Sequence, residues 1–254
     1  IFTDPGLIFS VMVFPFSASA FSSLRCLSVQ MRSCGDKRYP VLLVEESWRS
    51  KYARNRGDLM LVTSFIAPMF ATNCWVIAAG PGQECIIVDP GMPDISHEIT
   101  ALVAEHGLKP VAALITHGHL DHTFSVKSLA DGYGISAYIH AEDRDLLLRP
   151  QGAHGAEFLA TLDAMDFSEP KEVKNLRHGD EIEILDMKIT AIHAPGHTRG
   201  STMFSINGQL LISGDVLFAG SIGRTDLPSG SHEAMVKTLK TRVLPLSDDL
   251  RVLP

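Results

Sequence analysis

Three histidines and one aspartate lie within the run Thr116-His117-Gly118-His119-Leu120-Asp121-His122. The chain holds only 11 histidines in 254 residues, so three of them in one short run argue against an ordinary solvated loop. Imidazole nitrogens and carboxylate oxygens are the groups with which proteins hold zinc and similar divalent ions. The residue types and their spacing therefore predict a metal site in this run.

The apolar residues on both sides of the run indicate how the chain would position it. Val111–Ile115 is predicted to be a short buried strand that leads directly into Thr116, and His122–Ala130 is predicted to be a helix. The end of a strand fixes the backbone, and a loop lets His117 and His119 converge, whereas side chains two positions apart diverge on a helix. We therefore expect the metal site to follow a strand end.

Two later residues, His197 and Asp215, are further candidate ligands. His197 lies in a Pro-Gly turn after the predicted strand Lys188–His193, and Asp215 comes soon after the predicted strand Gln209–Ile212. Either residue alone would be weak support for a ligand. Their order after the first run strengthens the prediction of one shared site.

The chain from Met60 onwards has the hydrophobic periodicity of a folded domain. Strands and helices alternate in its first half and strands dominate its second half, which predicts two mixed sheets that pack together with helices outside. A Gly-rich loop is expected at residues 215–231. The further predicted strands are Leu61–Ile66, Asn73–Ala79, Glu84–Val88, Ala137–Ile139, Glu181–Leu185, Thr202–Ile206 and Leu250–Leu253, and the further helices are Ile95–Glu105, Glu142–Leu148 and Glu233–Arg242.

Residues 1–59 differ in composition from the rest of the chain. Residues 1–58 hold 8 Lys+Arg and 5 Asp+Glu, whereas the remaining residues hold 14 and 24. We expect residues 1–59 to be an N-terminal extension outside the fold. The apolar stretch Leu7–Leu24 lacks a preceding basic region and is interrupted by Pro15, so neither a signal peptide nor a membrane anchor is expected.

Charge and cysteine content limit the expected partners and compartment. The net charge of -7 argues against a nucleic-acid partner, which requires a basic face. The cysteines Cys26, Cys34, Cys74 and Cys85 form no Cys-x-x-Cys pair and are interpreted as small buried residues in a reducing compartment, with a Cys74–Cys85 disulfide as the alternative. We therefore expect a cytoplasmic protein that binds neither nucleic acid nor membrane.

Several short motifs accompany the candidate ligands. They are Asn73-Cys74, Val88-Asp89-Pro90-Gly91, Thr116–His122, Pro195-Gly196-His197-Thr198, Ser213–Phe218 and Gly223-Arg224-Thr225-Asp226-Leu227-Pro228. Together they resemble the metallo-β-lactamase superfamily, and in finer detail its single-domain glyoxalase II-like (hydroxyacylglutathione hydrolase-like) members. The resemblance covers the chain from about Met60 to Pro254. It implies an α+β fold, a four-layer αβ/βα sandwich of two mixed sheets with outer helices.

The resemblance also implies two adjacent divalent metal ions, with zinc as the expected metal and iron or manganese as alternatives. His117, His119 and His197 would hold the first ion, Asp121 and His122 would hold the second, and Asp215 would bridge both. The family supplies one more histidine from a Gly-His-Gly turn after the last strand, whereas this sequence ends at Val252-Leu253-Pro254. We therefore expect residues 60–254 to be a metallo-β-lactamase domain that lacks its C-terminal end, with an incomplete second site.

The activity that the resemblance implies is hydrolysis of a small-molecule thioester, such as an S-lactoylglutathione-like substrate, by a metal-bridging hydroxide. Asp121 would orient the nucleophile or take up its proton. Because the true β-lactamases place Cys where this chain has Asp215, antibiotic hydrolysis is not expected. The alternatives are a mononuclear iron persulfide dioxygenase, a lactone hydrolase of the same fold and an inactive metal-binding fragment. Leu227-Pro228 favours the hydrolase over the dioxygenase.

Other polar residues near the motifs have different expected roles. Asp89 follows a strand and could accept a hydrogen bond from a ligand imidazole, although Asp-Pro-Gly is also an ordinary turn. Arg224 and Asp226 are expected to pair and hold their loop. His140 and His193 have no motif around them and are not expected to be ligands.

Overall fold

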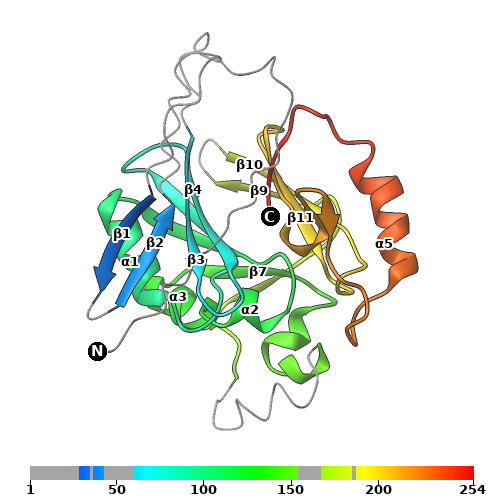
Figure 1. The fold of residues 1–254 in the computed structure, drawn as a ribbon, viewed down its shortest axis with the longest axis horizontal. Helices are drawn as coiled ribbons and strands as arrows, with labels where there is room; N and C mark the ends of the chain where they lie inside the picture. The colour runs from blue at the N-terminus through cyan, green and yellow to red at the C-terminus, as the bar shows by residue number, and fades with distance from the viewer. Residues whose placement is uncertain (1–28, 35–36, 43–59, 154–166, 185–186) are drawn as a thin grey trace, which may run out of the picture.

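The computed structural model describes residues 29–34, 37–42, 60–153, 167–184 and 187–254. Two large β-sheets, one of six strands and one of five, lie at the centre of the molecule (Figure 1). Helices lie on the outer side of each sheet.

The six-stranded sheet combines antiparallel and parallel strands. Its first three strands, β3 (Leu61–Ala67), β4 (Thr72–Ala78) and β5 (Glu84–Val88), are antiparallel neighbours. The next three, β6 (Lys109–Leu114), β7 (Ser136–His140) and β8 (Val173–Leu176), continue the sheet in parallel. Parallel neighbours need a crossover, which α1 (Ser96–Glu105) supplies between β5 and β6 and α3 (Val126–Tyr133) supplies between β6 and β7.

The five-stranded sheet is an antiparallel meander with one added strand. The meander consists of β9 (Glu181–Ile184), β10 (Met187–His193), β11 (Thr202–Ile206) and β12 (Leu210–Ile212). The last strand, β15 (Arg251–Leu253), pairs in parallel with β12.

Short elements fill the connections. They are α2 (Leu120–Thr123), the 3₁₀ turns η2 (Arg144–Leu147), η3 (Pro150–Gly152) and η4 (Gly214–Val216), the small hairpin of β13 (Leu217–Phe218) and β14 (Ser221–Ile222), and α5 (His232–Thr238), which continues into the π-helical turn η5 (Leu239–Val243).

Apolar side chains on the facing sides of the two sheets form the central core. Ile86 and Leu114 of the six-stranded sheet belong to one cluster with Ile189 and Phe204 of the five-stranded sheet, and all four are fully buried. Alternation along each strand leaves the opposite side chains for the outer faces. The sheets are therefore held together mainly by apolar burial.

Helices cover the outer faces of both sheets. Ile99 of α1 packs with Ile87 of β5, and α3 covers the neighbouring part of the same face. On the other side of the molecule, Met235 of α5 packs with Met203 of β11. The resulting order of helix, sheet, sheet and helix, which runs from left to right in Figure 1, confirms the predicted four-layer α+β sandwich.

Hydrogen bonds join the two sheets at the edge that carries the predicted ligands. The Thr202 N–H, at the start of β11, donates to the carbonyl oxygen of Thr116, which follows β6, at 2.8 Å. The side chains of Asn73 and Trp75 on β4 both donate to the carbonyl oxygen of Pro254, just after β15, at 2.9 and 3.0 Å. The relative position of the strand ends is therefore fixed by polar contacts as well as by the core.

Two predicted helices differ from the structure. The prediction of a helix at Glu142–Leu148 is wrong, because the backbone hydrogen bonds there span three residues and form only the 3₁₀ turn η2. The single helix predicted at His122–Ala130 is divided into α2 and α3. Ser125 lies at the break, where its hydroxyl donates to the Gly91 carbonyl at 2.7 Å and accepts from the Ile95 N–H at 2.9 Å, which ties the chain to the preceding loop.

The N-terminal part of the chain contributes a separate two-stranded sheet, β1 (Val29–Cys34) and β2 (Lys37–Leu42). That residues 1–59 lie outside the domain stays a prediction, and the apolar stretch Leu7–Leu24 falls outside the described residues. Of the helices that the structure describes, none has the length and apolar character needed to cross a membrane.

The two described cysteine side chains, Cys74 and Cys85, are buried free thiols, so the alternative of a disulfide between them does not hold. Burial raises the pKa of Cys85 to about 12 and raises the pKa of Cys74 as well. Both thiols therefore stay protonated and unreactive at neutral pH.

The packing of the two sheets predicts the effect of truncating a core leucine. Leu114→Ala should lower the free energy of unfolding by about 2–5 kcal/mol, because the removed side chain leaves a cavity between the sheets. Leu244→Ala is the matched control, since that side chain is 76% exposed, and it should change stability by less than about 0.5 kcal/mol. Urea unfolding with a metal chelator present measures both, and equal losses would contradict the assigned core.

Candidate metal centre

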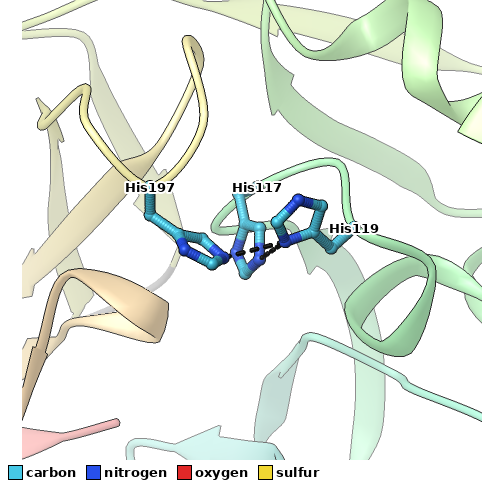
Figure 2. Close-up of side chains that lie close together, drawn as sticks. All are labelled: His117, His119 and His197. Atoms are coloured by element: carbon cyan, nitrogen blue, oxygen red, sulfur yellow. Dashed lines mark hydrogen bonds between the residues drawn. The ribbon is translucent and has the colours of Figure 1, made fainter. Parts of the chain in front are cut away.

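Three histidine side chains converge at one edge of the sandwich. His117 and His119 follow β6, and His197 follows β10, so the two loops approach each other from different sheets. Figure 2 shows the three rings pointing toward one another. His119 Nδ1 lies 3.1 Å from His117 Nε2 and 2.8 Å from His197 Nε2. All three side chains are buried, which removes them from competition with bulk water.

Contacts on the far side of two rings fix which nitrogen carries the hydrogen. The Thr116 hydroxyl donates to the Asp89 carboxylate at 2.6 Å, so His117 Nδ1, 3.0 Å from that hydroxyl oxygen, must be the donor to it. His197 Nδ1 lies 2.7 Å from the carbonyl oxygen of Arg224, which can only accept. Both rings therefore present an unprotonated Nε2 to the centre when they are neutral.

The spacing of the three nitrogens fits a divalent ion. Four ligands placed tetrahedrally at the ~2.0–2.1 Å of zinc–nitrogen bonds lie about 3.3 Å apart. The separations of 3.1 and 2.8 Å are close to this value. A proton on His119 Nδ1 could form a good hydrogen bond to only one of the two facing nitrogens, His117 Nε2 and His197 Nε2. A cation would instead attract the lone pairs of all three nitrogens. The donor set is therefore that of a metal site.

A second group of predicted residues lies beside the first. His122 Nε2 is 3.5 Å from Asp121 Oδ2 and 3.4 Å from Asp215 Oδ1. The other oxygen of Asp215, Oδ2, is 3.3 Å from His197 Nε2 in the first group. Asp215 thus faces both groups with one oxygen each. Five of the six predicted ligand residues fall into two groups whose ligand atoms lie within 4.8 Å of one another, namely His117, His119 and His197, and His117, His122 and Asp215. Asp121 lies beside them through its contact with His122.

Charge in this cluster shifts two pKa values in opposite directions. Burial alone would lower the pKa of His122, but the charges of Asp121 and Asp89 and hydrogen bonds to Asp215 and Asp89 outweigh it and raise the pKa well above its usual value. Burial would raise the pKa of Asp215, but its hydrogen bond to His122 and the charges of the neighbouring histidines lower it to about 2. In the absence of a metal, the surrounding carboxylates therefore favour the protonated form of His122.

Two outer contacts orient the second group. Asp89 accepts from His122 Nδ1 at 2.9 Å and from the Thr116 N–H at 2.8 Å, so the predicted hydrogen bond to a candidate ligand imidazole is present. The Thr72 hydroxyl donates to Asp121 Oδ2 at 3.1 Å. Thr72 could not be predicted from the sequence, because it lies 49 positions before its partner, at the start of a strand, and carries no local signal.

The loop of residues 223–226 also supports the first group. Arg224 and Asp226 form two hydrogen bonds, at 2.8 and 2.7 Å, so the predicted pairing is present and its role is to shape the loop. The carbonyl of Arg224 then accepts from His197. His140 and His193 stack on each other with ring centres 3.9 Å apart, and neither belongs to the described groups that could hold a metal ion.

Residues 67–253 match the family described as the metallo-beta-lactamase superfamily. The chain belongs to this superfamily. An uncharacterised protein of Mycobacterium leprae is 38% identical over 77% of this chain and 90% of its own length. The hydroxyacylglutathione hydrolase GloC of Haemophilus influenzae is 30% identical over 72% of this chain and 84% of its own length.

Solved structures give the same result. The BLEG-1 B3 metallo-beta-lactamase superposes with a TM-score of 0.66 and 28% identity, covering 76% of this chain and 90% of that protein. TTHA1623, solved in a di-iron-bound form, superposes with a TM-score of 0.60 and 30% identity, covering 76% and 91%. Superfamily membership and the cluster of histidines and aspartates together make this chain a divalent-metal-binding metallohydrolase.

The raised pKa of His122 predicts a pH-dependent metal affinity. A metal ion needs the unprotonated Nε2, so binding displaces the proton that the surrounding carboxylates favour. Affinity should fall as pH is lowered and rise as pH is raised. Calorimetric titration of the metal-free chain with Zn²⁺, in buffers of different ionisation enthalpy, measures the protons released.

The variant His122→Asn should release about one proton fewer per chain than the wild type. His97→Asn, which removes an exposed histidine on α1, is the matched control and should release as many as the wild type. Equal proton release by all three proteins would contradict the charge state assigned to His122.

Proposed function

We propose that this chain is a thioester hydrolase of the glyoxalase II type, which cleaves a small-molecule thioester such as S-lactoylglutathione in the cytoplasm. The observation that carries the proposal is the position of Asp215, whose two oxygens face two adjacent groups of ligand-type side chains at 3.3 and 3.4 Å. Such a carboxylate is suited to bridge two ions. The identity of 30% to a protein named hydroxyacylglutathione hydrolase supports the substrate class.

In this proposal His117, His119 and His197 would hold the first ion, Asp121 and His122 would hold the second, and Asp215 would be shared between them. Three imidazoles favour zinc in the first group. Iron is the alternative, supported by the relative of 30% identity solved in a di-iron-bound form. Among the described residues the second group offers one imidazole and two carboxylates, which is a weaker set for zinc than the first.

When bound, divalent ions lower the pKa of water to near 7 and polarise a carbonyl, which is the chemistry that thioester hydrolysis needs. We expect Asp121 to orient the attacking water or to take up its proton. Its 21% exposed side chain and the hydrogen bond from Thr72 to one of its oxygens support this role. Asp89 and the Arg224 carbonyl keep His122 and His197 in the orientation that the site requires. The thiolate leaves without a general acid, because thiols have a pKa of about 8.5.

The experiment is an assay of S-lactoylglutathione hydrolysis by the metal-loaded chain. The wild type should hydrolyse the thioester. His119→Ala should lower kcat/KM strongly, because it removes a nitrogen from the centre of the first group. Loss of a residue that only orients a metal ligand typically costs ~10–100-fold, and we expect a larger loss here. His97→Ala, an exposed position on α1, is the matched control and should retain wild-type activity.

Absence of thioester hydrolysis by the folded, metal-loaded wild type would contradict the proposal. Oxygen consumption with glutathione persulfide would then identify a dioxygenase, and turnover of a lactone would identify a lactone hydrolase. Hydrolysis of a β-lactam would instead identify a β-lactamase, as the name of the 28% identical BLEG-1 B3 metallo-beta-lactamase suggests. Metal binding without any turnover would identify an inactive metal-binding chain.

A further inference from the structure

A buried aspartate outside the ligand cluster contacts both of the loops that carry its histidines. Asp143 lies in the turn between β7 and η2 and is completely buried. Its Oδ2 accepts from the Gly118 N–H at 2.9 Å and from the Thr198 hydroxyl at 2.6 Å, and its Oδ1 accepts from the Gly200 N–H at 2.7 Å. Gly118 separates His117 from His119, and Thr198 directly follows His197.

The backbones of these loops approach Asp143 and the following turn so closely that a side chain at either of two glycines would force a neighbour to shift. A Cβ atom at Gly200 would lie 2.6 Å from Asp143 Cγ, and a Cβ atom at Gly118 would lie 2.6 Å from Leu146 Cδ1 and 3.0 Å from the Asp143 carbonyl oxygen. Real Cβ atoms essentially never show the separation of 2.6 Å, and 3.0 Å is tighter than most of their contacts. The carboxylate is therefore enclosed by the two ligand-bearing loops and by its own turn.

A short hydrogen-bond chain extends the contact along the second loop. The Thr198 hydroxyl donates to Asp143, so the Ser201 hydroxyl, 2.8 Å away, must donate to Thr198. Ser201 Oγ also accepts from the Thr198 N–H at 2.9 Å. His193 Nε2 lies 2.8 Å from the Arg199 carbonyl oxygen, to which it donates, and holds the same loop from its other side. The loop after His197 is thus fixed through Asp143 and not by its own turn alone.

We propose that Asp143 is a positioning residue that sets the separation between the His117–His119 pair and His197, and so the geometry of the first metal group. Burial of a carboxylate is costly unless donors surround it, and here the three donors are the Gly118 and Gly200 amides and the Thr198 hydroxyl of the two ligand loops. Asp143 does not touch the metal-facing nitrogens and acts only through the backbone. This inference rests on the metal centre of the proposed function, but not on its substrate.

The test compares Asp143→Asn with the wild type in binding of Co²⁺ and Zn²⁺ to the metal-free chain of residues 1–254. The amide has the same size but only one accepting oxygen, so at least one of the three donors loses its acceptor. We expect the affinity for the first metal to fall roughly 10–100-fold and the visible Co²⁺ absorption to change. Asp131→Asn is the matched control, because Asp131 also accepts a backbone N–H but lies on α3, outside the ligand loops, and it should keep the wild-type spectrum and affinity.

A second pair of variants covers the case in which Asp143→Asn does not fold. Thr198→Val removes the hydroxyl that donates to Asp143 and should weaken Co²⁺ binding and alter its spectrum, whereas Thr198→Ser keeps the hydroxyl and should restore both. Wild-type affinity and spectrum in folded Asp143→Asn, or in Thr198→Val, would overturn the proposal, as would a wild type that binds no Co²⁺. If the wild type binds metal but does not hydrolyse S-lactoylglutathione, the substrate proposal fails while the role of Asp143 is judged by the same spectra.

Discussion

The structure of this site depends on one constraint: three imidazole nitrogens are held face to face, 2.8 and 3.1 Å apart, at a place that excludes water. Unprotonated nitrogens at this separation repel one another unless a cation lies between them. The protein orients two of the rings through contacts on their other side, His117 through the Thr116 hydroxyl and His197 through the Arg224 carbonyl. Those anchors in turn rely on the packing of the two sheets, which brings the ends of β6 and β10 to one edge.

Some carboxylates lie within the cluster of imidazoles, and another lies behind it. Asp121 and Asp215 lie in the cluster itself and keep 21% and 26% of their side chains exposed, so a substrate can reach them. Asp89 is buried behind the ligands, at the positive φ of 48° that non-glycine residues seldom adopt, and it orients His122 from there. The negative charge of these carboxylates favours binding of a divalent cation. When no cation is bound, it raises the pKa of His122.

Sequence patterns predicted most of the strands, because alternating apolar residues are a local signal. The short histidine motifs are local signals too, and the structure gathers their side chains at one edge, while their role as metal ligands stays a prediction. The short strand β8 was missed because Leu176 alone of its four residues is buried, which leaves almost no pattern. The prediction of a helix at Glu142–Leu148 was wrong. The composition of this segment suits a helix, but the tertiary contacts of the turn after β7 determine its backbone conformation. Thr72 and Asp143 were missed for a related reason: their partners lie 25 to 57 positions away, and such distances appear only after folding.

We propose that the nitrogen face of a metal site is formed by His117, His119 and His197, and that Asp215 is shared between this site and a second group. The most direct measurement is a crystal structure of the metal-loaded chain, with anomalous scattering recorded at the absorption edge of the metal. We expect an anomalous peak within bonding distance of His117 Nε2, His119 Nδ1 and His197 Nε2, with an Asp215 oxygen beside it. Anomalous density elsewhere, or its absence between these three nitrogens in a metal-loaded protein, would contradict the account.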